Sequence, residues 1–143
     1  MRGVVFLPPP LKRRVREMAT AAWPLEACGL LEGNAHGTVV HLRRALACAN
    51  LDPDPEHRYR IDPETYLRAE HAARAIGRMI VGVWHSHPHG GAAPSATDAA
   101  ESWPGWSYLI AGVTNEGMIA LRCWRMLDDE PFEQPIRAAG EPR

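Results

Sequence analysis

The chain has 143 residues, of which 45% are hydrophobic and 23% are charged, and this size suits one domain with a sizeable core rather than two domains. Its 16 basic and 17 acidic side chains give a net charge of −1, which argues against nucleic acid as a partner. The three cysteines form no C-x-x-C pair, which argues against a disulfide framework or a thiolate zinc site. No apolar run reaches the roughly 20 residues that cross a bilayer, and the start does not resemble a signal peptide, so we expect no membrane partner and a cytoplasmic location.

The N-terminal residues predict a strand followed by a helix. Residues 3–7 are a short β-rich run. After three prolines, apolar residues recur at helical spacing between Leu11 and Ala22, until Pro24 ends the pattern.

A hairpin and a loop are predicted next. Residues 28–31 and 38–42 are apolar and β-rich, and residues 33–37 between them contain turn formers. Residues 49–62 carry many turn residues without an apolar period, so we expect a loop there, with a short strand at residues 58–61.

A second helix and a buried strand precede the most unusual part of the sequence. Asp62 is a good N-cap before Pro63, and apolar residues at helical spacing continue up to Gly77, a candidate C-terminal cap. Residues 79–84 are too short and too continuously apolar for a surface helix, and they predict a strand that is buried on both faces.

The C-terminal part predicts a second hairpin. Residues 107–113 and 118–126 are β-rich and flank a Thr-Asn-Glu-Gly turn. Residues 131–136 predict an edge strand, and residues 137–143 a frayed tail. Together the elements predict a single α/β domain over residues 1–143, in which two to three helices flank a mixed β-sheet.

The segment after the buried strand contains residues that can bind a metal ion. His85 and His87 alternate along extended backbone, so their side chains share one face. Ser95 and Asp98 lie three residues apart at a predicted helix start, so they also share a side. Two imidazoles and one carboxylate are one ligand short of the zinc tetrahedron, as in catalytic sites that keep one position for water.

Each half of this pattern also has an ordinary structural interpretation. An isolated H-x-H pair often arises by chance, and Ser95 with Asp98 resembles a capping box that only satisfies backbone N–H groups. His89 is expected to be a solvated loop residue rather than a fourth ligand. The two halves together favour a site, and a hydrolase would further need a carboxylate for the proton and an oxyanion donor, for which Ser95 is suited.

H-x-H, seven residues and then S-x-x-D form the signature of the JAMM metalloproteases, also called the MPN-plus or Mov34 family, and this chain resembles that family over most of residues 1–125. The sequence PLEACGLLEG around Glu26 also resembles the family segment that carries an upstream glutamate. The resemblance implies a fold of the type shared by JAMM proteins and cytidine deaminases.

The resemblance further implies a zinc-dependent metallopeptidase. His85, His87 and Asp98 would bind Zn²⁺, Glu26 would act as general base and later general acid, and Ser95 would stabilise the oxyanion. Small prokaryotic relatives act on ubiquitin-like or sulfur-carrier proteins with a flexible C-terminal tail, so we expect such a protein as the substrate. The cleaved bond can be a peptide or an isopeptide bond, and the reaction can trim a tail or release a joined amino acid. A homodimer is also compatible with the sequence.

The main alternative is a non-catalytic scaffold of the same fold, which is disfavoured because all five site positions are filled. A zinc nucleobase deaminase would need H-x-E and P-C-x-x-C, and neither is present. Four aromatic residues near the motif are expected to line the cleft or to fill the core: Trp84, Trp103, Trp106 and Tyr108.

Overall fold

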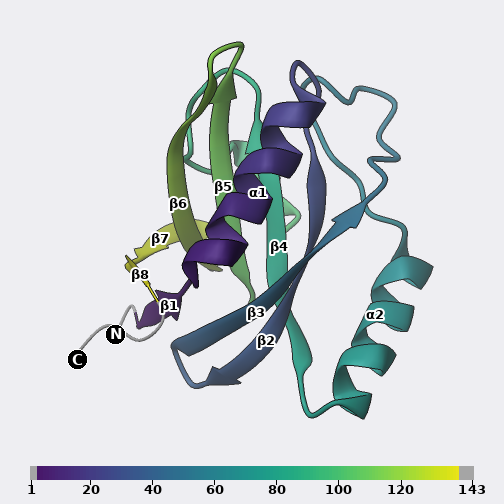
Figure 1. The fold of residues 1–143 in the computed structure, drawn as a ribbon, viewed down its shortest axis with the longest axis vertical. Coiled ribbons are helices and arrows are strands. Elements are labelled where there is room, and N and C mark those ends of the chain that lie inside the picture. Colours follow the sequence, from purple (N-terminus) through teal and green to yellow (C-terminus); the bar gives the residue numbers. More distant parts are fainter. Residues whose placement is uncertain (1–2, 139–143) are drawn as a thin grey trace.

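The computed structural model describes residues 3–138 and contains eight strands and three helices in that range (Figure 1). The helices are α1 (Pro9–Ala22), α2 (Pro63–Ala75) and α3 (Ala96–Ala100). The strands are β1 (Val4–Phe6), β2 (Cys28–His36), β3 (Val39–Cys48), β4 (Met79–His87), β5 (Ser107–Thr114), β6 (Gly117–Leu127), β7 (Glu130–Gln134) and β8 (Ile136–Arg137). The predicted α/β class with a mixed sheet and two to three helices is confirmed.

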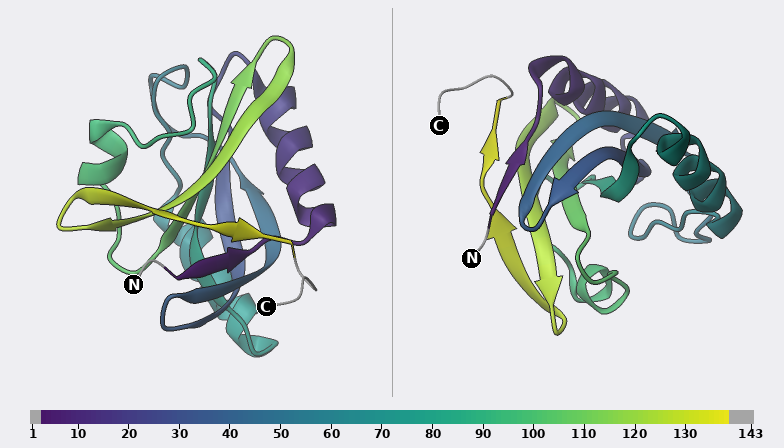
Figure 2. Two further views of the ribbon diagram at one scale, coloured as in Figure 1. Left: turned by 90° about the vertical axis from the view of Figure 1, so that its left-hand side faces the viewer. Right: turned by 90° about the horizontal axis from the view of Figure 1, so that it is seen from below.

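The strands form one sheet in the order β7-β6-β5-β4-β2-β3-β1-β8. β7 and β8 lie at opposite ends of this order although only Pro135 separates them in the chain. β8 pairs in parallel with β1, and Figure 2 shows the yellow C-terminal segment alongside the purple β1. The sheet therefore curls, so that the chain passes from one edge strand to the other through Pro135 alone. The strand β4 lies near the middle of the sheet.

The two faces of the sheet bury separate hydrophobic clusters. Neighbouring strand residues alternate between them: Leu31 and Leu109 belong to the cluster that includes α1 side chains, whereas Leu30 and Ile110 belong to the cluster against α2. The buried side chains of α1 follow helical spacing, namely Leu11, Val15 and Ala19. The helices α1 and α2 thus cover opposite faces of the sheet.

Local signals in the sequence explain where α2 begins and ends. The Asp62 carboxylate accepts a hydrogen bond from the Glu64 N–H at 3.1 Å, and Pro63 is the first helical residue, as predicted. Gly77 has a φ of 76°, which lets the chain leave the helix. Ile76, the last apolar residue before Gly77, is the C-cap of α2 and is 59% exposed, so the buried face of the helix ends before it.

Three other boundaries differ from the sequence prediction. Residues 58–61 form no strand, and the β2–β3 turn is confined to residues 37–38 because β2 continues through His36. Arg137 lies in β8 rather than in a tail, and the predicted tail residues 139–143 lie outside the described residues. None of the helices within residues 3–138 is both long enough and apolar enough to cross a membrane.

Candidate metal and catalytic site

β4 carries the two motif histidines into the centre of the sheet. The buried strand predicted for residues 79–84 and the extended backbone predicted for the two histidines form one strand, which ends at His87 and pairs antiparallel with β2 and parallel with β5. His85 and His87 share a face with Val83, and both imidazoles are buried. Trp84 points to the opposite face, where its Nε1 donates to the Leu46 carbonyl at 3.0 Å, so this residue fills the core.

Glu26 lies in irregular backbone between α1 and β2, two residues before the first residue of β2, the strand that pairs with β4. Its carboxylate is buried, and its Oε1 lies 3.5 Å from the Nδ1 of His85. Its backbone N–H donates to the Pro55 carbonyl at 2.7 Å, and its own carbonyl accepts from the Asn50 side chain at 3.1 Å. The segment around Glu26, which the sequence resemblance singled out, therefore places a carboxylate next to His85.

Asp98 reaches the same histidines from α3. Its Oδ2 lies 3.0 Å from the Nε2 of His87 and 3.8 Å from the Nε2 of His85. Ser95 is the N-cap of α3, where its hydroxyl accepts the Asp98 N–H at 3.0 Å and its own N–H donates to the Asp98 carboxylate at 2.9 Å. The capping box suggested by the sequence is therefore present in the structure, and it orients the Asp98 side chain toward the histidines. His89 is exposed and stacks on His87 with ring centroids 5.1 Å apart.

The donor set fits a metal ion. One ligand atom from each of Glu26, His85 and His87 can be chosen so that all three lie within 4.8 Å of one another. Within residues 3–138, the buried site atoms that lack a hydrogen-bond partner are Glu26 Oε1, both ring nitrogens of His85 and Nδ1 of His87. Buried polar atoms are normally paired, so four such atoms at one place match a cation-binding site of two imidazoles and carboxylates.

The site also perturbs its own ionisable groups. Burial alone would raise the pKa of Asp98, but the hydrogen bond from His87 and the nearby His85 charge lower it to about 2. Burial likewise opposes the charged form of His87, but the Asp98 carboxylate outweighs this effect and raises the pKa of the imidazole. Asp98 is therefore an anionic ligand candidate throughout the neutral pH range.

A cavity of about 450 Å³ lies on the α2 side of the sheet, separated from His85 by the ring of Tyr59. Tyr59 forms part of its wall and stacks on His85, with ring centroids 4.4 Å apart and planes inclined by 26°. Burial raises the pKa of Tyr59 well above its ordinary value, so the phenol stays neutral. The other lining residues are mostly apolar or aromatic and include Leu30, Ile61, Tyr66, Leu67, Val83, Trp103, Trp106 and Tyr108.

The sequence interpretation was right about all four aromatic residues near the motif, because Trp84 fills the core and the other three line the cavity. Trp103, Trp106 and Tyr108 line the cavity, and Tyr108 places its hydroxyl 2.6 Å from the Trp103 N–H. The interpretation missed the roles of Tyr59 and Asn50, because it assigned Tyr59 to a short strand and Asn50 to a loop. The repeated Asp, Asn and Pro residues there were read only as turn formers.

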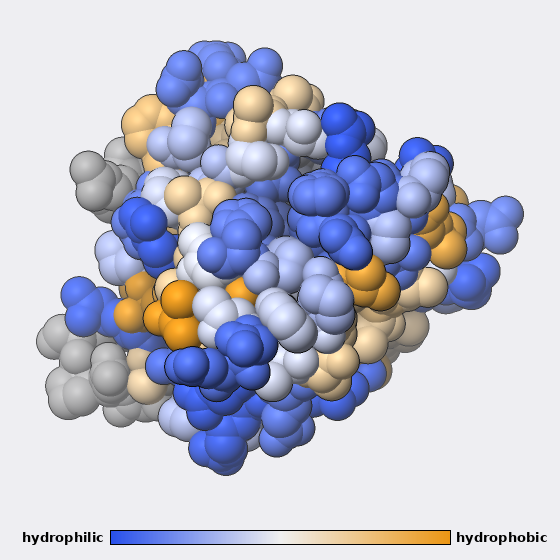
Figure 3. All heavy atoms as spheres, turned by 90° about the horizontal axis from the view of Figure 1, so that it is seen from above, coloured by the Kyte–Doolittle hydropathy of each residue, from blue (hydrophilic) through white to orange (hydrophobic). Residues whose placement is uncertain are grey.

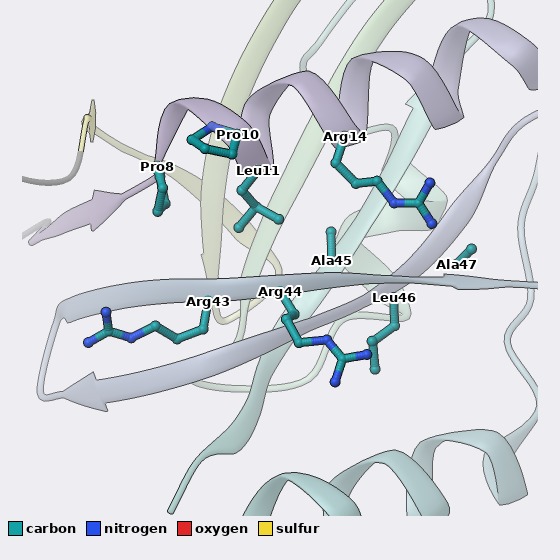
Figure 4. Close-up of a pocket in the computed structure, with 9 residues that line it drawn as sticks. All are labelled: Pro8, Pro10, Leu11, Arg14, Arg43, Arg44, Ala45, Leu46 and Ala47. Atoms are coloured by element: carbon teal, nitrogen blue, oxygen red, sulfur yellow. The ribbon is translucent and has the colours of Figure 1, made fainter. Parts of the chain in front are cut away.

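A second groove, of about 640 Å³, lies elsewhere between α1 and β3 (Figure 4). Arg14, Arg43 and Arg44 line it, but Figure 4 shows their side chains pointing in different directions, and Arg44 lies 3.9 Å from Glu32. These cations do not converge on one ligand position.

Figure 3 shows the end of the molecule where β4 stops. This surface is mostly hydrophilic, with small hydrophobic groups between the hydrophilic residues.

Comparison with known proteins gives the same family over most of the chain. The family model described as prokaryotic homologues of the JAB domain matches residues 8–127. A Haloferax volcanii desampylase is 38% identical over 96 residues, which are 66% of this chain and 68% of that protein. A probable TtuB-protein conjugate cleaving protease of Thermus thermophilus is 30% identical over 109 residues, covering 76% of this chain and 70% of that one.

Two further similarities extend over more of the chain. The CysO-cysteine peptidase of Mycobacterium tuberculosis is 28% identical over 119 residues, which are 82% of this chain and 80% of that protein. The solution structure of a Desulfitobacterium hafniense protein superposes with a TM-score of 0.84 at 31% identity, covering 96% of this chain and 94% of that one.

Proposed function

Because the chain belongs to the family of prokaryotic JAB-domain homologues, we propose that it is a zinc-dependent peptidase acting near the C-terminus of a ubiquitin-like or sulfur-carrier protein. The observation that carries this proposal is the convergence of Glu26, His85, His87 and Asp98, with four buried polar atoms that lack a hydrogen-bond partner within residues 3–138. Three separate segments of the chain supply these side chains.

His85, His87 and Asp98 are the proposed ligands of the metal. A bound zinc ion would lower the pKa of a water molecule and polarise the carbonyl of the scissile bond. Asp98 suits the ligand role because its carboxylate is anionic and touches both imidazoles. Glu26 Oε1 accepts no hydrogen bond from any described residue, so this oxygen is available to take a proton.

Glu26 is the proposed general base and acid. Its carboxylate removes a proton from the attacking water, whose oxygen adds to the amide carbon, and then delivers that proton to the leaving nitrogen as the carbon–nitrogen bond breaks. Ser95 is the proposed oxyanion donor, because its hydroxyl accepts the Asp98 N–H and still has its own hydrogen to donate.

The substrate class follows from the relatives and fits the cavity. One relative is named as a cleaver of TtuB-protein conjugates, and another as a CysO-cysteine peptidase. The cavity that shares Tyr59 with His85 is lined mostly by apolar and aromatic side chains, which suits an extended tail rather than a folded surface. We propose that the tail of the carrier protein lies in this cavity while its last carbonyl reaches the histidines.

A pair of matched substrates tests the proposal. One is a sulfur-carrier protein extended by a few residues after its C-terminal Gly-Gly, and the other is the same carrier joined to a lysine side chain. Intact-mass spectrometry should show that the wild-type protein releases the carrier from at least one of them, whereas Glu26→Gln releases it from neither. No release by the wild type, or equal release by both proteins, would favour the non-catalytic scaffold instead.

A further inference from the structure

One side chain in the loop between β3 and α2 makes an unusual number of hydrogen bonds. The Asn50 Nδ2 donates to the Glu26 carbonyl at 3.1 Å and to the Arg58 carbonyl at 2.9 Å. Its Oδ1 accepts the N–H groups of Asp52 and Arg60, each at 3.1 Å. An amide side chain offers two donor hydrogens and two acceptor lone pairs, so Asn50 uses its whole capacity.

These bonds join the catalytic candidate Glu26 to the wall of the cavity. Tyr59 lies between Arg58 and Arg60, the two residues whose backbone Asn50 holds, and its ring stacks on His85. The same loop also contacts Glu26 through the Pro55 carbonyl, which accepts the Glu26 N–H at 2.7 Å. One loop therefore positions both the candidate base and the ring that covers a candidate ligand.

Glu26 depends on this support because no regular element holds it. It lies after the end of α1 and before the start of β2, so neither helical nor sheet hydrogen bonds fix its peptide. Its Oε1 has no hydrogen-bond partner among the described residues, so no hydrogen bond at that oxygen holds the carboxylate in place. Small errors in the placement of a base can cost about a hundredfold in rate.

We propose that Asn50 is a positioning residue for hydrolysis, which aims Glu26 at the reacting water and keeps Tyr59 stacked on His85. This inference rests on the proposed function of the site. Asn50 itself need not touch the substrate or the metal, because its effect passes through the Glu26 peptide and the loop of residues 50–60.

The variants Asn50→Asp and Asn50→Ala test this role. Asp keeps the two acceptor contacts and loses both donated bonds, whereas Ala loses all four without adding a charge. Asn34 offers a matched control, because its Nδ2 also donates to a backbone carbonyl, that of Gly77 at 2.9 Å, with no link to the site. The controls are Asn34→Asp and Asn34→Ala.

The expected kinetic result is a fall in kcat of about tenfold or more for both Asn50 variants, with KM within about threefold of wild type. Zinc content at saturating zinc should stay near one ion per chain, because the ligands are unchanged. The Asn34 variants should keep kcat within about twofold, since they leave Glu26 and the loop in place.

A second readout does not depend on activity. Arg58 and Arg60 are exposed trypsin sites on either side of Tyr59, so brief proteolysis of the metal-free proteins reports whether the loop stays closed. The Asn50 variants should be cut there about tenfold faster than wild type, and the Asn34 variants should not.

Two kinetic results would overturn the inference while leaving the proposed function intact: wild-type kcat in both folded Asn50 variants, or an equal loss in the Asn34 controls. Unchanged trypsin cleavage in Asn50→Asp would do the same. By contrast, a wild-type protein that hydrolyses neither carrier substrate would show that the proposed function itself is wrong.

Discussion

The backbone N–H of Ala27 donates to the hydroxyl of Ser86 at 2.8 Å, and the Ser86 N–H donates back to the Ala27 carbonyl at 3.0 Å. Ala27 follows Glu26, and Ser86 lies between His85 and His87. This reciprocal pair therefore ties the segment that carries the candidate base to the strand that carries the candidate ligands.

Ser86→Ala should destabilise the protein more than an ordinary serine substitution. It leaves the Ala27 N–H without its acceptor next to a fully buried side chain, which costs about 1–3 kcal/mol. Urea denaturation should show this loss, whereas Ser102→Ala, which removes a less buried hydroxyl bond to the Ala99 carbonyl, should cost about 1 kcal/mol or less. An equal loss of unfolding free energy in the two variants would show that the Ala27–Ser86 hydrogen bond contributes no more to stability than the Ser102–Ala99 bond.

Metal content should separate the roles of the two carboxylates. Asp98→Asn removes an anionic ligand candidate and should lower zinc affinity by about tenfold or more. Glu26→Gln should bind zinc with an affinity within about threefold of wild type while losing hydrolysis. Elemental analysis after dialysis against a zinc buffer measures both. Loss of zinc in Glu26→Gln would mean that Glu26 is a ligand, consistent with its place in the Glu26, His85 and His87 group.

Tyr59 should influence metal binding through its ring rather than its hydroxyl. The ring stacks on His85 and shields it, so Tyr59→Ala should weaken zinc binding about tenfold, whereas Tyr59→Phe should stay within about twofold of wild type. Competition with a fluorescent zinc chelator gives both affinities. If Tyr59→Phe were as weak as Tyr59→Ala, the phenol oxygen rather than the stacked ring would be responsible.

The parts of the site that the sequence predicted are those set by local geometry. His85 and His87 share a face because extended backbone alternates, and Ser95 faces Asp98 because a helix start brings residues three apart together. Glu26 could be singled out only through the family resemblance, because its approach to His85 depends on the pairing of β2 with β4.

The remaining differences come from contacts between distant segments. Residues 58–61 contain Tyr59 and Ile61, which favour strands, but their neighbouring peptides bond to Asn50 instead of to another strand. The two-residue β8 exists only because β1 lies alongside it, about 130 residues away in sequence. Neither contact leaves a periodic signal in the sequence.

The buried thiol of Cys123 should make stability fall at alkaline pH. Burial raises its pKa to about 12, whereas the same thiol in the unfolded chain ionises near pH 8.5 to 9. Between these values the unfolded state binds fewer protons than the folded state, so stability falls as pH rises, by up to about 1.4 kcal/mol per pH unit from this group.

Urea denaturation of wild type and Cys123→Ala under reducing conditions, at pH values about one unit apart (pH 8, 9 and 10), isolates the contribution of this thiol to stability. The variant should lose less stability than wild type over this range, because it has no thiol to ionise at that position. Parallel pH dependences in the two proteins would contradict the assignment. Cys48→Ala, which removes a less buried thiol, is the control.

The most direct test of the central claim is hydrolysis of a sulfur-carrier protein with a C-terminal extension, measured on metal-stripped protein before and after one equivalent of zinc is added. The account predicts no release of the carrier by the stripped protein and full recovery with zinc, because His85, His87 and Asp98 are left intact by stripping. Undiminished hydrolysis by the stripped protein, or none after zinc is restored, would contradict a zinc-dependent peptidase.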